Sequence, residues 1–136
     1  MARQKLLCLD IGAKIIGVAV SDAFGMAFPR EEIRWGGDKT MLQAALHQFE
    51  VQEGTPSLVV LGSPQNASPS MHAAQEVVEG IFEALGWPVV HYDEHVSTQE
   101  AANRIADIEE ETGTRFGGRR DSVAAQIILE RYLARS

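Results

Sequence analysis

Two short apolar runs that meet at an acidic residue and a glycine constrain the fold of this chain most strongly. The runs Leu6–Leu9 and Ile15–Val20 are too short for helices, and the second is rich in β-branched residues, so they predict two paired strands. Asp10 ends the first run, where burial of its charge costs on the order of several kcal/mol unless something compensates it. Gly12 allows a sharp turn directly after it. A carboxylate in this position suits a cation or a phosphate-bearing ligand, and the alternative is a turn aspartate that caps a hairpin.

The rest of the chain alternates predicted strands and helices. An extended segment follows Asp22, and its Pro29 suits an edge strand better than a central one. Capping residues at Asp38, Ser70 and Ser97, followed by apolar residues at helical spacing, predict the starts of three helices. The further predicted strands are 58–61 and 88–92, and the predicted helices are 39–52, 70–85, 97–111 and a last one from residue 121. The stretch 112–120, with three glycines and three arginines, predicts a mobile loop.

This order of elements predicts a mixed α/β sheet within a single domain, residues 1–136. Three consecutive strands joined by short turns form an antiparallel meander, and later strands separated by helices are reached by right-handed parallel crossovers. The predicted strand order is therefore 3-2-1-4-5, with helices on the faces of the sheet.

Composition and charge narrow the classes of partner. The chain is 45% hydrophobic and 23% charged, and it has no apolar run near the ~20 residues that a membrane span needs. A single cysteine, Cys8, excludes an internal disulfide and fits a reducing cytoplasm. The net charge of −7 is concentrated in residues 40–114, which carry −11, whereas both ends of the chain are net positive. A surface built from the two ends could still bind a polyanion in a salt-dependent way.

Acidic residues stand where an α/β sheet usually keeps its site, beyond the carboxyl ends of the strands. Asp10 ends the first strand, Glu94 follows the fifth and Asp121 opens the last helix. Like charges a few ångströms apart repel by roughly 4 kcal/mol per pair at an effective dielectric near 20, so their convergence requires a counter-charge. Hard divalent cations, Mg²⁺ or Mn²⁺, are suited to provide this counter-charge, and a pair of them can support phosphodiester hydrolysis. The competing interpretation makes Asp121 a helix-dipole partner and Glu94 a solvated charge.

Reaching this arrangement demands room on the fourth strand. In the predicted order, the strand before Glu94 lies two places from the strand of Asp10, roughly 10 Å away at ~4.8 Å per strand. Gly62 and Ser63 end the strand between them, and their small side chains would leave space for Glu94 to pass.

The sequence gives less support to a histidine or thiolate metal site, a nucleophilic catalytic site or a nucleotide-binding motif. His91 and His95 are four residues apart, but on a strand and the loop after it rather than on one helix face. One cysteine is too few for a thiolate zinc site, and the chain contains no nucleophile elbow, Walker loop or dinucleotide fingerprint.

Four segments resemble, in order, the motifs of the YqgF/RuvX family, a bacterial group with the ribonuclease H-like fold. The first segment resembles the opening Asp-x-Gly motif of the family, and the third resembles its Asp-Glu-Arg-Leu-Thr-Thr signature. Together they cover nearly the whole chain: Leu9–Asp22, Val59–Asn66, Tyr92–Ala101 and Asp121–Leu133.

This resemblance implies a cytoplasmic, metal-dependent endonuclease. The family is described both as Holliday junction resolvases and as nucleases that mature the 5′ end of pre-16S ribosomal RNA. By position, the resemblance implies that Asp10, Glu94 and Asp121 are catalytic carboxylates that bind Mg²⁺ or Mn²⁺. Cutting a four-way junction requires two sites, hence a symmetric homodimer. The residues implied in substrate binding are Lys14, Asn66, Arg115, Arg119 and Arg120.

Three departures from the family pattern keep other functions open. Ala13 stands in place of the usual Thr, Ile15 in place of an Arg, and His95 in place of the Arg after the Glu. Each removes a polar or cationic group that could contact phosphate, and the altered positions Ala13 and Ile15 favour a non-catalytic nucleic-acid-binding or ribosome-assembly factor. An ATPase of the actin and sugar-kinase superfamily is a further alternative, but those proteins need two such domains. DNA and RNA are not distinguished, because ionic contacts to phosphate carry no such information.

Overall fold

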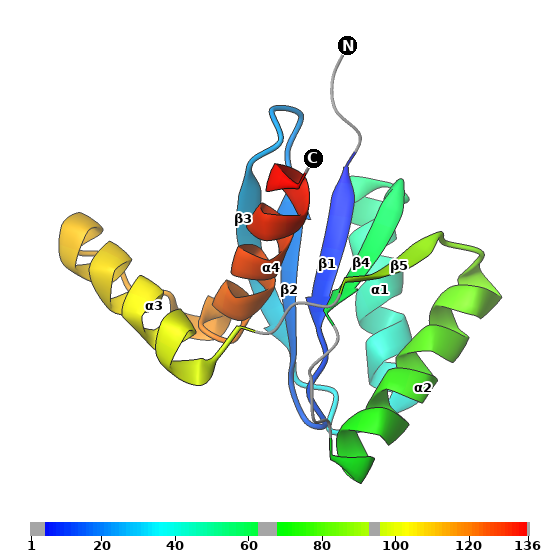
Figure 1. Cartoon of the computed structure of the whole chain (residues 1–136). Helices are drawn as coiled ribbons and strands as arrows, with labels where there is room; N and C mark the ends of the chain where they lie inside the picture. Colours follow the sequence, from blue (N-terminus) through cyan, green and yellow to red (C-terminus); the bar gives the residue numbers. More distant parts are fainter. Residues whose placement is uncertain (1–4, 63–67, 93–95, 136) are drawn as a thin grey trace.

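A five-stranded mixed sheet forms the centre of the molecule in a computed structural model that describes residues 5–62, 68–92 and 96–135 (Figure 1). The strand order is β3-β2-β1-β4-β5, as the sequence predicts. β1 pairs antiparallel with β2 and parallel with β4, β2 pairs antiparallel with β3, and β4 pairs parallel with β5. The strands are β1 (Leu6–Asp10), β2 (Ile16–Ser21), β3 (Ala27–Ile33), β4 (Leu58–Gly62) and β5 (Val89–Tyr92).

The predicted helices all form, each starting within one residue of the predicted position. Asp38 caps α1 by accepting a hydrogen bond from the Thr40 N–H at 2.9 Å. The second helix begins at Pro69 and is capped by Ser68, so the prediction of Ser70 as its cap is wrong. Proline suits the first helical turn because its missing N–H has no partner there in any case. The helices are α1 (Lys39–Glu53), α2 (Pro69–Leu85), α3 (Thr98–Thr112), the short 3₁₀ helix η1 (Gly117–Arg119) and α4 (Ser122–Ala134).

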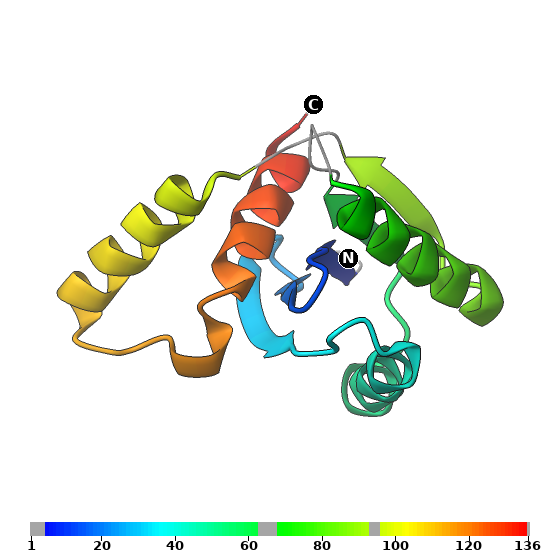
Figure 2. The same cartoon turned by 90° about the horizontal axis from the view of Figure 1, so that it is seen from below.

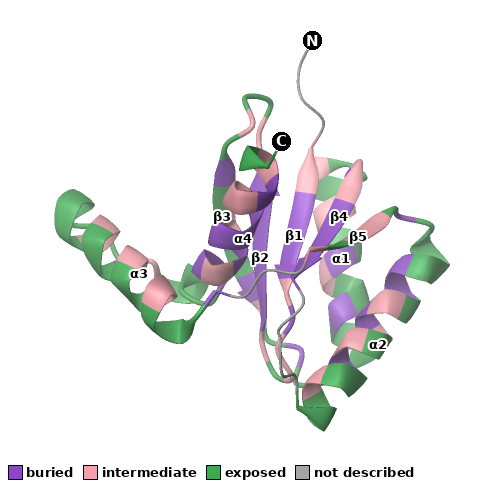
Figure 3. Cartoon of the chain, viewed as in Figure 1, coloured by how far each residue is buried: buried purple, intermediate pink, exposed green. Residues whose placement is uncertain are grey.

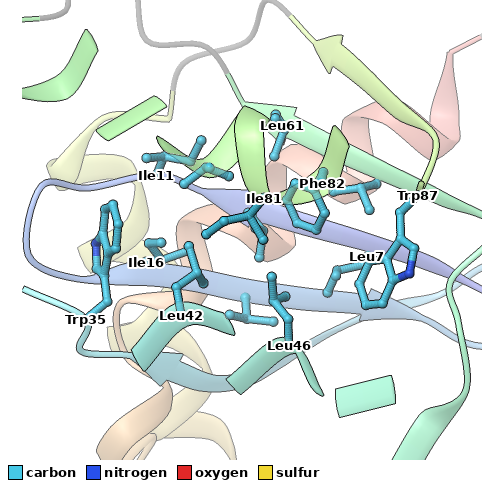
Figure 4. Packing of buried hydrophobic residues seen from close by; sticks show 14 of the residues in the cluster. Leu7, Ile11, Ile16, Trp35, Leu42, Leu46, Leu61, Ile81, Phe82 and Trp87 are labelled. Atoms are coloured by element: carbon cyan, nitrogen blue, oxygen red, sulfur yellow. The ribbon is translucent and has the colours of Figure 1, made fainter. Parts of the chain in front are cut away.

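Helices cover both faces of the sheet, and the sheet separates two hydrophobic clusters, one under each helical layer (Figure 2). On one face, α1 and α2 bury Leu42, Leu46, Val78 and Phe82 against the apolar side chains of β1, β2 and β4 (Figure 4). On the other face, α4 packs directly on β1, β2 and β3. Because β4 contributes to both cores, its bare apolar run is buried on both sides, as the sequence predicts.

The third helix lies outside this sandwich. Figures 1 and 2 show α3 reaching away from the sheet beyond α4, and Figure 3 shows most of its surface exposed. Ser97 caps it as predicted, accepting the Glu100 N–H at 3.0 Å. The Glu100 carboxylate bonds Arg131 of α4, and Arg104 bonds Glu130 of the same helix at 3.0 Å, so polar side chains help to fix α3 on α4. Within the described residues, every helix is too short or too polar to span a membrane.

Candidate active site

Asp10 lies at the end of β1 on the face that α4 covers. In the register it stands beside Gly17 of β2 and Gly62 of β4. Side chains alternate along a strand, so Asp10 shares a face with Cys8, which packs in the core beneath α4. Burial, and then the nearby Asp10 carboxylate, raise the pKa of the Cys8 thiol far above its ordinary value. The thiol is therefore an inert core group, and its pKa reports the proximity of Asp10.

Asp121 reaches the same point of the sheet from the far end of the chain. A Cβ on Gly17 would lie 2.3 Å from the Asp121 carbonyl oxygen, so only glycine lets the loop before α4 come this close. The buried Ser122 hydroxyl accepts the Val18 N–H at 3.0 Å and fixes the start of α4 on β2. The Asp121 side chain makes no capping hydrogen bond to the helix that it opens. The structure thus brings Asp10 and Asp121 to one side of the sheet at Gly17.

A third carboxylate, Glu32 of β3, joins this neighbourhood and is missed by the sequence analysis. Arg30 pairs with Val18 and Ile33 with Ile16, so two residues of β3 stand opposite the single Gly17, which is a β-bulge. The Glu32 side chain is only 3% exposed, and Arg34 donates to its Oε1 at 2.8 Å. Burial, and then the adjoining Asp121 carboxyl group, raise the pKa of Glu32 against the opposing effect of Arg34.

These carboxylates are arranged in a row rather than in a tight cluster. Asp10 and Glu32 belong to the strands on either side of β2, and Asp121 lies over Gly17 between them. Within residues 5–62, 68–92 and 96–135, no three acidic, histidine or cysteine side chains converge into a complete metal site. Glu94 and Asn66, both assigned from the resemblance, lie outside the described residues, so their roles stay predictions.

Two residues that follow β3, Trp35 and Gly36, hold the loop after Asp10 in place. The Trp35 indole donates to the Gly12 carbonyl at 3.0 Å, and the Gly36 N–H donates to the Lys14 carbonyl at 2.9 Å. Trp35 is buried beside Ile11 and Ile16 (Figure 4). Lys14 is exposed on this anchored loop, four residues after Asp10 in the sequence. The backbone of this loop is thus fixed by β3 and the residues after it, and the phosphate-binding role of Lys14 stays a prediction.

The arginine-rich loop before Asp121 is more ordered than the sequence predicts. Glu109 of α3 accepts the Phe116 N–H at 3.0 Å, and its carboxylate lies 3.3 Å from Arg115 and 3.4 Å from Arg120. These contacts lower the pKa of Glu109, the backbone hydrogen bond from Phe116 contributing most. Two of the three predicted substrate-binding arginines therefore share the one carboxylate of Glu109.

The third arginine lies on the open edge of the sheet. Arg119 of η1 makes no ion pair with any described residue. It borders a groove of about 480 Å³ between β3 and α1, whose lining also includes Arg30, Arg34 and Glu32. A smaller groove of about 360 Å³ adjoins Arg119, Arg30 and Lys5. Basic and acidic side chains thus alternate along the β3 edge, since Lys5 and Arg30 both pair with Glu53 of α1 and the lining also includes Glu31.

A side chain of α4 occupies the space beside Gly62. A Cβ at Gly62 would lie 2.8 Å from Cδ1 of Ile128, because that side chain of α4 fills the space above the strand. A small residue at 62 therefore serves the packing of α4, and the path of Glu94, which lies outside the described residues, stays a prediction.

The chain is similar throughout to one protein family. The model of the family described as RuvX, Holliday junction resolvase, matches residues 4–135. A protein of Lacticaseibacillus casei named "Putative pre-16S rRNA nuclease" is 35% identical over 137 residues, covering 96% of this chain and 94% of the relative. A Streptococcus pyogenes protein of the same name is 33% identical, covering 98% and 99% of the two chains.

Solved Holliday junction resolvases share the architecture. The fowlpox virus Holliday junction resolvase superposes with a TM-score of 0.61 at 16% identity, covering 95% of this chain and 97% of that one. RuvC of T. thermophilus in complex with Holliday junction substrate superposes with a TM-score of 0.55 at 15% identity, covering 95% and 93%. At such identities the likeness concerns the fold alone, and with the strand order it confirms the ribonuclease H-like fold that the sequence predicts.

Proposed function

Since this chain belongs to the RuvX Holliday junction resolvase family, we propose that it is a divalent-metal-dependent endonuclease that hydrolyses phosphodiester bonds in structured nucleic acid. The observation that carries this proposal is the close approach of Asp121, at the start of the last helix, to Gly17, the β2 partner of Asp10. Two carboxylates so placed form an acidic centre at the carboxyl end of β1, where α/β sheets keep their sites.

The residues present fit a hard divalent cation. Asp10 and Asp121 offer only oxygen donors, and a buried oxygen of Glu32 next to them receives no hydrogen bond from a described residue. Asp10 and Asp121 would hold Mg²⁺ or Mn²⁺, and Glu94 would complete the set by its position in the family motif. When bound, such an ion polarises a water nucleophile and offsets charge on the leaving oxygen.

Basic side chains around the site would bind the substrate backbone. Lys14, exposed on the anchored loop, is suited to a phosphate next to the scissile bond. Arg119 and the groove along β3 provide a path for the adjoining backbone, and Arg115 and Arg120 can exchange Glu109 for phosphate. Asn66 is a further proposed contact, from its position in the second family motif.

The substrate is proposed to be a four-way DNA junction, precursor 16S ribosomal RNA, or both. The description of the family supports the DNA junction, and the names of the relatives support the precursor RNA. Either would be met in the cytoplasm, and symmetric cutting of a junction would require a homodimer with two sites.

Replacement of Asp10 tests this function directly. We expect Asp10→Asn to reduce cleavage of a mobile four-way junction and of precursor RNA by at least about 100-fold in Mg²⁺ or Mn²⁺, because a ligand charge is lost. Asp107→Asn, which removes an exposed charge from α3, should cleave like the wild type. Cleavage by Asp10→Asn at the wild-type rate would place the active site elsewhere.

A second candidate is a non-catalytic nucleic-acid-binding or ribosome-assembly factor. Ala13 and Ile15 favour it, because they leave Lys14 as the one cation of the loop after Asp10. The same assay separates the two functions. Binding of the junction or the RNA without any Mn²⁺-stimulated cleavage would select the factor.

A further inference from the structure

We propose that Glu32 is an additional metal ligand, and that it holds a divalent cation of the Mg²⁺ or Mn²⁺ class together with Asp121. The inference rests on the proposed function, because Asp121 belongs to that site. The inference goes beyond the proposed function by adding a residue from β3, a strand to which the sequence motifs assign no ligand.

The first support is the buried oxygen of Glu32. The residue as a whole is 9% exposed, and its Oε2 receives no hydrogen bond from any donor in the described part of the chain. Burial of an ionised carboxylate oxygen without a partner is costly, so such an atom calls for a proton or a cation. Arg34, whose side chain is largely exposed, donates a hydrogen bond only to the other oxygen of Glu32, Oε1.

The second support is the neighbour that Glu32 faces. Its carboxyl group lies within hydrogen-bonding reach of the Asp121 carboxyl group, and neither carries a donor when both are ionised. The other charged groups around it are Arg34 and, along the groove that Glu32 lines, Glu31 and Arg119. Mg²⁺ is commonly bound by one or two carboxylates, with waters and substrate phosphates filling the other positions. The Glu32 and Asp121 pair supplies that donor set.

The third support is the backbone that directs Glu32 to this place. The bulge puts both Glu31 and Glu32 opposite Gly17, and thereby turns a side chain that regular alternation would direct elsewhere. Bulges are frequent beside active sites for this reason. Glu31, the other residue of the bulge, is exposed and lies near Gly118, which makes it a matched control.

Mn²⁺ binding to the full chain tests the proposal without measuring cleavage. We expect Glu32→Gln to weaken Mn²⁺ binding in calorimetry at least about 10-fold, or to remove one bound ion. The same variant should melt at a higher temperature than the wild type without metal, because a repulsive buried charge is gone, and it should gain less from added Mn²⁺. Glu31→Gln should bind Mn²⁺ like the wild type.

A second variant keeps the test valid if Glu32→Gln fails to fold. Arg34→Met removes a cation that competes with the metal for Glu32, from a side chain that is 70% exposed. It should strengthen Mn²⁺ binding several-fold. Unchanged Mn²⁺ affinity in both variants would overturn the proposal and indicate a proton shared between Glu32 and Asp121.

The outcomes separate this inference from the proposed function. If Asp10→Asn abolishes Mn²⁺ binding while Glu32→Gln does not change it, the site stands and Glu32 is not a ligand. If the wild-type chain binds no Mn²⁺ and cleaves neither substrate, both the metal-dependent function and this inference are wrong.

Discussion

At the scale of single residues, Gly17 joins the two ends of the chain at the site. The Asp121 carbonyl occupies the place of its missing side chain, and Asp10 and the Glu32 bulge stand on either side of it. The obstacle to a larger residue is backbone, which cannot swing aside as a flexible side chain can.

We therefore expect Gly17→Ala to destabilise the fold by about 1–3 kcal/mol, as overpacking does, and to weaken Mn²⁺ binding because α4 and Asp121 are pushed off β2. Urea unfolding and calorimetry measure the two effects. Gly80→Ala is the matched control, because its Cβ meets nothing within 4 Å and alanine favours the helix by about 0.5–1 kcal/mol. Gly17→Ala with wild-type stability would show that this close approach is not required.

The position of a residue at the end of a strand can be predicted from the local sequence, whereas its burial can depend on strand register. Asp10 is recognisable because an ionisable group ends an apolar strand beside a glycine. Glu32 is not, because Glu31 and Glu32 are equivalent in the sequence and only the bulge decides which one is buried. The packing of Ile128 beside Gly62 is not predicted either, since Ile128 belongs to a helix more than sixty residues away.

At the scale of elements, the connection from α3 to α4 is ordered by one carboxylate. Glu109 binds the Phe116 N–H and two arginines across a stretch without helical or strand periodicity. The sequence predicts the helices themselves from apolar spacing and caps. It predicts this connection as mobile, because contacts six to eleven residues apart in an irregular loop leave no pattern.

Glu109→Gln tests whether that carboxylate competes with substrate phosphate. We expect junction binding to tighten at low salt, because Arg115 and Arg120 are freed to contact phosphates. The slope of the log binding constant against log salt concentration should become more negative by about one to two. Fluorescence anisotropy over a salt series measures both. Glu111→Gln, an exposed neighbour, should change neither. Weaker junction binding by Glu109→Gln would show that the loop needs Glu109 to present its arginines.

The same variant has a defined pH dependence. Because the pKa of Glu109 lies below its ordinary value of 4.5 in the folded protein, its contribution to stability is complete above that value. It is lost as the pH falls through the lower folded-state pKa. Wild type and Glu109→Gln should therefore differ in urea midpoint at pH 7 and converge in acid.

At the scale of the whole molecule, the order of elements is enough to predict the topology. Three strands without intervening helices must meander, and later strands separated by helices must cross over in parallel, which yields 3-2-1-4-5. The site is less predictable, because it depends on how α4 lies across β1, β2 and β3 and on a bulge that no short motif encodes.

A homodimer follows from the proposed activity on junctions, since one copy offers one acidic centre for two symmetric cuts. We expect sedimentation velocity to find two copies of the chain on each four-way junction, and the two cuts to be coupled in time. One copy per junction, with both cuts made, would contradict this arrangement.

The hydrogen bond from Trp35 to Gly12 gives the molecule an optical reporter of its own. The indole is anchored two residues beyond Asp10, so any displacement of that loop changes the polarity around a natural fluorophore. Trp87 lies at the opposite end of the same core, beside Phe82, and replacing it with phenylalanine would leave Trp35 as a single emitter (Figure 4). Ion and nucleic-acid occupancy could then be followed by emission, without a label.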